Sequence, residues 1–186
     1  MIRFISGLFF VLASCNLYAE SFLDNAIFGV SVINQDINLE VKQPGNTLNL
    51  TESGTGVGVY LDKYYAGKYR FNSTISYVAY DEFDLASLSL SADYLVPFNK
   101  ELSFFVGVSG GAGMQQHAEQ SVSDASVGLI YGVQLGGIAY LSKQVMAEIG
   151  YRQKSANIVT DVTAANITET VINEVDEIYL SLLLMF

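Results

Sequence analysis

Hydrophobic residues alternate with small or polar residues along many short stretches of this chain. The clearest stretch is 86–96, where every second residue is apolar: Ala86, Leu88, Leu90, Ala92, Tyr94 and Val96. A period of two places such a row on one face of a β-strand. The same alternation predicts seven further strands, at 26–33, 56–62, 69–80, 102–109, 127–136, 145–152 and 176–186.

The connections between these predicted strands alternate in length. Polar segments at 34–55, 113–125 and 155–175 are expected to be long loops, and 81–84 a brief acidic loop. The remaining connections, at 66–68, 97–101 and 141–144, are short. About eight strands joined in this way predict an up-and-down antiparallel β-barrel that crosses a membrane, with short turns on one side and longer loops on the other. A soluble sandwich does not explain this alternation as well.

The last predicted strand, 176–186, has one unbroken apolar face. Its members are Ile178, Leu180, Leu182, Leu184 and Phe186. About ten residues is the length that a tilted strand needs to cross a bilayer. This row is therefore expected to face lipid, while Glu177, Tyr179 and Ser181 face inward.

Composition and charge narrow the class of protein. Of the 186 residues, 51% are hydrophobic, yet beyond the first twenty no apolar run is long enough for a transmembrane helix. The net charge of −10 argues against a nucleic-acid partner, because phosphates require a basic surface. Cys15 is the single cysteine, so no disulfide framework is expected.

Residues 1–19 have the pattern of a cleavable signal peptide. Arg3 provides the positive start, 5–13 the apolar centre, and Ala19 the small residue before the cut. An alternative is a lipobox at 12–15, in which Cys15 would carry lipid and become the mature N-terminus. If the signal peptide is cleaved after Ala19, residues 20–186 form the barrel domain.

The inward faces of the predicted strands carry many glycines and serines and a few charges. These charges are Asp62, Arg70, Asp93, Glu148 and Arg152. An isolated charge is costly in a confined lumen, so the two arginines are expected to bridge the carboxylates and fill a polar interior. The interior of an eight-stranded barrel is just wide enough to be filled by side chains. A gated ion path through the network is the alternative.

The whole predicted barrel resembles the small outer-membrane β-barrel family typified by the OmpA transmembrane domain and OmpX. The resemblance rests on the alternations at 88–96 and 127–135, on 150–152, and on the terminal Phe186, which is similar to the signal that directs such barrels to insertion. It implies a protein of the bacterial outer membrane with a structural or surface-interaction role. Its implied partners are membrane lipids and lipopolysaccharide, the barrel-assembly machinery, and a host or phage surface ligand; a monomer is expected. A small pore is the alternative.

Catalytic and cofactor chemistry has little support in the sequence. His117 is the single histidine, and the histidine–serine spacing of lipid A deacylase barrels is absent around it. The acids Asp81, Glu82 and Asp84 could bind Ca²⁺, but a solvated acidic turn explains them equally well. No enzyme activity, metal or cofactor is therefore expected.

Overall fold

The computed structural model describes residues 26–43, 45–117, 126–164 and 167–185. The predicted signal peptide, Cys15 and Phe186 lie outside these residues. In the part that is described, no helix is long and apolar enough to cross a membrane.

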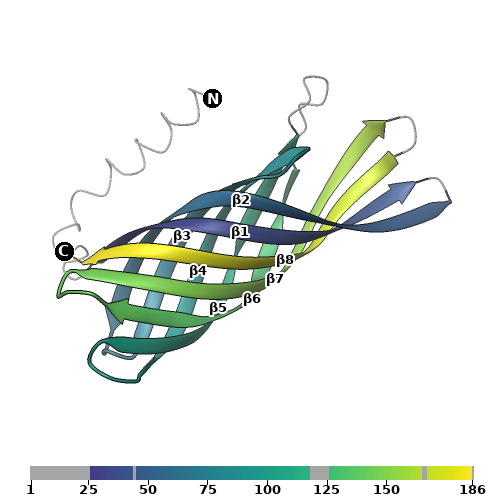
Figure 1. Ribbon diagram of the computed structural model, residues 1–186. Coiled ribbons are helices and arrows are strands. Elements are labelled where there is room, and N and C mark those ends of the chain that lie inside the picture. The colour runs from purple at the N-terminus through teal and green to yellow at the C-terminus, as the bar shows by residue number, and fades with distance from the viewer. Residues whose placement is uncertain (1–25, 44, 118–125, 165–166, 186) are drawn as a thin grey trace, which may run out of the picture.

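Eight antiparallel strands form one closed barrel in sequence order, and this confirms the predicted fold (Figure 1). The strands are β1 (Ala26–Gln43), β2 (Asn46–Tyr65), β3 (Tyr69–Ala79), β4 (Phe83–Pro97), β5 (Leu102–His117), β6 (Ser126–Tyr140), β7 (Val145–Ala164) and β8 (Ile167–Met185). The barrel closes where β1 pairs with β8, with Ile27 opposite Met185 and Lys42 opposite Glu169.

Three tight turns gather at one end of the barrel, here called the short-turn end. At the β2–β3 turn, Ala66 and Gly67 both have positive φ, of 51° and 65°. Two consecutive positive values are characteristic of the type I′ turn, whose twist matches that of the flanking strands. The Lys68 amide donates to the Tyr65 carbonyl at 3.2 Å and closes this turn.

Two of the predicted long loops are in fact strands. Residues 34–55 continue β1 and β2 as one hairpin, paired from Ala26 opposite Lys63 to Gln43 opposite Asn46. Most of 155–175 likewise continues β7 and β8. Alternation persists in both segments, with Ile37, Leu39 and Val41 buried between exposed or half-buried polar neighbours. The prediction was wrong because the many Asn, Asp and Ser residues were interpreted as loop formers, although nearly all of them lie on the outer face.

The predicted loop at 113–125 also requires correction. Strand β5 extends to His117, which is paired with Phe83 of β4. Residues 118–125 lie outside the described part of the chain.

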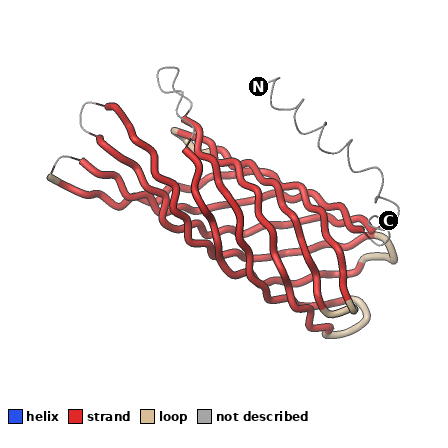
Figure 2. The backbone as a smooth tube through the Cα atoms, turned by 180° about the vertical axis from the view of Figure 1, so that it is seen from behind, coloured by secondary structure: helices blue, strands red, loops and turns tan. Residues whose placement is uncertain are grey.

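Strands β7, β8, β1 and β2 therefore extend beyond the others as a four-stranded sheet, here called the projecting sheet. Figures 1 and 2 show its two hairpins beyond the closed barrel, at the end opposite the short turns. Pairing of β2 with β3 ends at Thr55 opposite Ala79, and pairing of β7 with β6 ends at Asn157 opposite Leu129. Segments 46–54 and 158–164 are thus the two outer edges of the projecting sheet.

An exposed apolar belt surrounds the part of the barrel that begins at the short-turn end. In β8, Ile178, Leu180, Leu182 and Leu184 all point outward, with 41–58% of their surface exposed. Comparable rows run along the other strands, for example Val106 and Val108 in β5. So many exposed hydrophobic side chains in continuous rows require a lipid environment.

Candidate functional site in the barrel lumen

The lumen is filled by side chains in three successive layers. The inward side chains of β7 pass through all three layers in order, beginning at the short-turn end. Met146 lies in an apolar layer, Glu148, Arg152 and Lys154 lie in a charged layer, and Ile158 lies in a second apolar layer. The first layer contains the buried apolar residues Ile27, Leu95, Ile138, Met146 and Leu183, and the third contains Ile37, Phe83, Leu85, Ile158 and Ile172. The prediction of a polar lumen therefore holds mainly for the middle layer, since the layers on both sides of it are largely apolar, with one buried Thr160–Gln115 hydrogen bond in the third.

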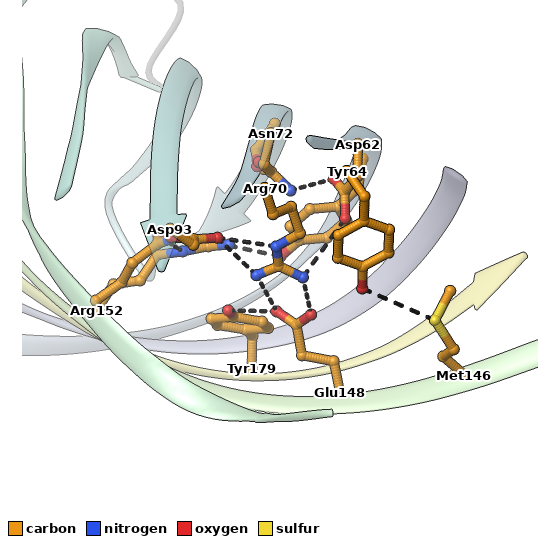
Figure 3. Close-up of polar contacts among 12 residues, drawn as sticks. Asp62, Tyr64, Arg70, Asn72, Asp93, Met146, Glu148, Arg152 and Tyr179 are labelled. Atoms are coloured by element: carbon orange, nitrogen blue, oxygen red, sulfur yellow. Dashed lines mark hydrogen bonds and ion pairs between the residues drawn. The ribbon is translucent and has the colours of Figure 1, made fainter. Parts of the chain in front are cut away.

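Arg70 is the centre of the first half of the middle layer (Figure 3). Its guanidinium lies 2.8 Å from the Asp93 carboxylate and 3.5 Å from that of Asp62, and it forms a further ion pair with Glu148. All four side chains are at most 2% exposed. Three acids thus share one base, and the guanidinium also lies over the Phe105 ring, 4.6 Å from its centroid.

Glu177 is the centre of the second half, where the charge ratio is reversed. Its carboxylate accepts from Arg152 Nη1 at 2.6 Å and from Lys154 Nζ at 2.8 Å. The amide of Gln35 donates to the same carboxylate at 2.8 Å. Glu177 is therefore the acid shared by two bases, and all three ionised side chains are buried.

Neutral side chains connect the two halves. The Gln134 oxygen accepts from Arg152 Nε at 2.9 Å, while its nitrogen donates to Asp93. The Tyr179 hydroxyl donates to Glu148 at 2.7 Å, and its ring lies 3.9 Å from the Arg152 guanidinium carbon. One continuous network thus joins three bases to four acids across the lumen, here called the lumen network.

Two glycines make room for this network. A Cβ at Gly150 would collide with the Tyr179 ring, and one at Gly107 would collide with Asp93. Small residues at these positions therefore allow the large polar groups to fill the interior. Such filling is what an eight-stranded barrel needs to close its interior.

The five charged residues predicted for the lumen all point inward and are buried. The structure brings four of them together, because Arg70 contacts Asp62, Asp93 and Glu148 as expected. Arg152 differs from the expectation, since its ion pair is with Glu177 instead of those carboxylates.

The sequence interpretation placed neither Lys154 nor Glu177 in the network. Lys154 was missed because strand 145–152 was ended too early, although the inward alternation 148, 150, 152 leads directly to it. Glu177 was expected to face inward but was given no partner. Extending the alternation by one step would have identified Lys154, whereas the partner of Glu177 depends on the register between β7 and β8.

The chemistry available to the lumen network is ion pairing. Among the described residues, no group of three or more His, Cys, Asp or Glu side chains could hold a metal ion. The network's acids contact bases and hydrogen-bond donors, and its geometry is that of a plug of paired charges.

No family model and no curated protein matches this sequence. Solved structures share its fold. Neisserial surface protein A is 14% identical, with 84% of this chain and 97% of that chain covered at a TM-score of 0.59. Outer membrane protein H of Pseudomonas aeruginosa is 17% identical, with 87% and 99% covered at 0.57. Outer membrane protein OprG of the same species is 14% identical, with 88% and 96% covered at 0.54.

These similarities confirm the resemblance to the small outer-membrane barrels. At such low identity they concern the fold alone. Together with the exposed apolar belt, the fold is that of a bacterial outer-membrane β-barrel.

Proposed function

We propose that this protein is a non-catalytic outer-membrane barrel that acts by contact at the cell surface, through its projecting sheet. The observation that carries the proposal is the continuation of four strands beyond the closed barrel. In a barrel of this family the short turns face the periplasm, so the projecting sheet faces the cell exterior.

The edges of the projecting sheet suit the addition of an extended partner strand. Exposed sheet edges are usually protected by lysine, proline or a bulge, because unpaired backbone groups invite pairing with another chain. Segment 46–54 contains neither lysine nor proline and pairs with β1 without a bulge, whereas segment 158–164 also lacks lysine and proline but has a register irregularity between Asp161 and Ala164. We infer that the partner is a protein of a host or phage surface that presents an extended segment, which would pair with one of these edges.

Side chains of the 46–54 edge would add specificity. Leu48 and Leu50 lie on its inner face and are 40% and 48% exposed. Thr47, Asn49 and Thr51 alternate with them on the outer face and are exposed as well. A partner strand with apolar residues on one face and polar residues on the other would complement this edge.

The filled lumen argues against the alternative of a small pore. An ion would have to pass two apolar layers and separate the ion pairs of the lumen network, and burying an uncompensated charge is expensive. In planar bilayers we expect no steady single-channel openings from the protein. Steady openings that Arg152→Ala abolishes would contradict this part of the proposal.

The surface role is tested by shortening one hairpin at a time. Joining Leu39 to Leu50 through Asn-Gly removes the tip of the β1–β2 hairpin, since these two residues are paired and Asn-Gly forms a two-residue turn. Joining Ile158 to Ile172 in the same way removes the β7–β8 tip. We expect at least one truncation to reduce attachment to host cells or phage adsorption by tenfold or more.

A matched control is deletion of 119–124, which shortens the β5–β6 connection and leaves the projecting sheet intact. All three variants should keep heat-modifiable migration in detergent gels, which reports a folded barrel. If attachment and adsorption are the same for both truncations as for the unmodified protein, the surface role is wrong.

A further inference from the structure

The height of the apolar belt differs between the two sides of the barrel. In β4 the outward apolar row continues from the short-turn end to Ala86, and in β5 and β6 it continues to Met114 and Val127. With about 3.3 Å per residue and a strand tilt of about 40°, these rows end roughly 28–33 Å above the short-turn end. This matches or exceeds the band of about 25 Å that is usual for such barrels.

On the opposite side the row is much shorter. It ends at Val32 in β1, Val57 in β2, Tyr151 in β7 and Ile178 in β8. The same geometry places these ends only about 15–20 Å above the short-turn end. The two sides differ by roughly 8–18 Å, although both begin at the same rim.

Polar side chains occupy the outer surface directly above the short rows. They are here called the lateral polar face: Asn34, Asp36, Asn38, Ser53, Thr55, Gln153, Ser155, Asn157, Glu174 and Asp176. All of them point outward and are exposed, except Asp176, which is half-buried. At the same height on the other side, the outward residues are apolar, for example Leu88, Ala112 and Leu129.

The lateral polar face contains three carboxylates, and neutral groups are their hydrogen-bond partners. Asn38 donates to Glu174 at 2.9 Å, and Ser53 donates to Asp36 at 2.5 Å. At the lower border, the Tyr151 hydroxyl donates to Asp176 at 2.6 Å. A tyrosine with its ring in the apolar row and its hydroxyl on a polar group is typical of a membrane–water boundary.

The carboxylates of the lateral polar face argue against lipid acyl chains and against a second copy of the protein as its neighbour. Acyl chains would surround three carboxylates with hydrocarbon, which is unfavourable for charges on the lipid side of a barrel. A second copy would bring like charges together, which is also unfavourable. Bilayers adapt to a short apolar segment by becoming thinner next to it.

We propose that the outer leaflet is thinned along β7, β8, β1 and β2, and that its polar headgroups and water lie against the lateral polar face. The hydrocarbon layer is then about 10 Å thinner on this side than beside β4, β5 and β6. The hydrocarbon layer of the membrane thus differs in thickness on the two sides of the barrel.

The chain contains no tryptophan, so single-tryptophan variants are specific probes of each side. Asn38→Trp and Ser155→Trp report on the lateral polar face, while Leu88→Trp and Ala112→Trp report on the opposite side. Each variant is reconstituted in dioleoyl phosphatidylcholine vesicles, with or without lipid brominated on its acyl chains. Quenching by the brominated lipid and by aqueous iodide is then compared.

We expect iodide to quench the first pair at least fivefold more strongly than the second, and brominated lipid to show the reverse order. Equal quenching by brominated lipid on both sides would overturn the proposal. Protection of the first pair from both quenchers would also overturn it, because this result indicates contact with another protein copy. Heat-modifiable migration confirms that each variant is folded.

A second variant changes the height of the short side itself. Replacing Asn34, Asp36 and Asp176 with leucine extends the apolar rows of β1 and β8. In this background, Ser155→Trp should become at least threefold less sensitive to iodide and more sensitive to brominated lipid. An unchanged response to both quenchers would overturn the link between belt height and lipid depth.

Discussion

Carboxylates of the lumen network and of the lateral polar face lie on the same strands but have different interaction partners. In the lumen, Glu177 is neutralised by Arg152 and Lys154 at ion-pair distance. On the outside, Glu174 of the same strand is bonded by the neutral amide of Asn38. Charges shielded from water need opposite charges, whereas charges in contact with water or headgroups do not. The neutral partner of Glu174 thus indicates a polar environment outside the upper part of β8.

The largest expected effect comes from removing the cation of the first half of the lumen network. Arg70→Ala leaves Asp62, Asp93 and Glu148 buried together without a base. Breaking a buried ion pair from one side costs about 3–5 kcal/mol, and here three acids lose their partner. Urea unfolding in phospholipid vesicles should show a loss of stability in this range.

Lys68→Ala in the exposed β2–β3 turn is the control, and it should change stability by less than about 0.5 kcal/mol. If Arg70→Ala unfolds at the same urea concentration as this control, Arg70 is not needed to stabilise the buried lumen acids in the folded barrel.

The two sides of the apolar belt can be compared with one matched pair of arginine substitutions. Leu88 of β4 and Ser155 of β7 both point outward at a similar distance from the short-turn end. An arginine on the lipid side costs about 2–4 kcal/mol near the bilayer centre and about 0–1 kcal/mol near the interface. Leu88 lies about 5 Å inside the upper end of its apolar row, whereas Ser155 lies above the end of its own row, so Leu88→Arg should be more destabilising than Ser155→Arg in vesicle unfolding, by about 1–3 kcal/mol. Equal losses would mean that the lateral polar face lies at the same lipid depth as β4.

Glu177→Gln tests the second half of the lumen network with a smaller change. The amide keeps the size of the side chain but leaves Arg152 and Lys154 without a negative partner. We expect a loss of about 2 kcal/mol, in the range found for hydrogen bonds to charged groups. Adding Lys154→Met should recover part of this loss, because it removes one of the two buried cations. If the double variant is less stable than Glu177→Gln alone, the Lys154 cation is not destabilised by the loss of the Glu177 charge.

The sequence predicted the barrel better than it predicted the projecting sheet, for a physical reason. In the belt, a lipid-facing row such as 178–184 must be apolar, so alternation is easy to recognise in the sequence. In 34–55 the outer face is polar, and the apolar residues, such as Ile37 and Leu39, lie on the inner face. This composition resembles that of a loop, although the period of two is still present.

The lumen network was predictable in its members and less so in its pairing. Inward position follows from alternation, which placed Arg70 and Glu148 in the lumen. The partner of a charge depends on register between strands that are distant in sequence, such as β7 and β8, where Arg152 lies opposite Glu177. A single sequence does not contain this register, and so the Arg152–Glu177 pair was missed.

The smallest expected effect concerns Glu52, on the inner face of the 46–54 edge. Partial burial, and secondarily Glu82 and Asp81, raise the pKa of the Glu52 carboxyl above its ordinary value of 4.5. A raised folded-state pKa means that the folded edge binds a proton more tightly than the unfolded one. The resulting stabilisation is fully present below the ordinary value and is lost as the pH rises through the raised value.

Amide hydrogen exchange of residues 46–54 measures this effect at the edge itself. After correction for the intrinsic rate, exchange should be slower at pH 4 than at pH 7, and Glu52→Gln should abolish this difference. Amides of β4 in the closed barrel are the internal control and should show the same protection at both pH values. A pH dependence that persists in Glu52→Gln would assign the proton to another group.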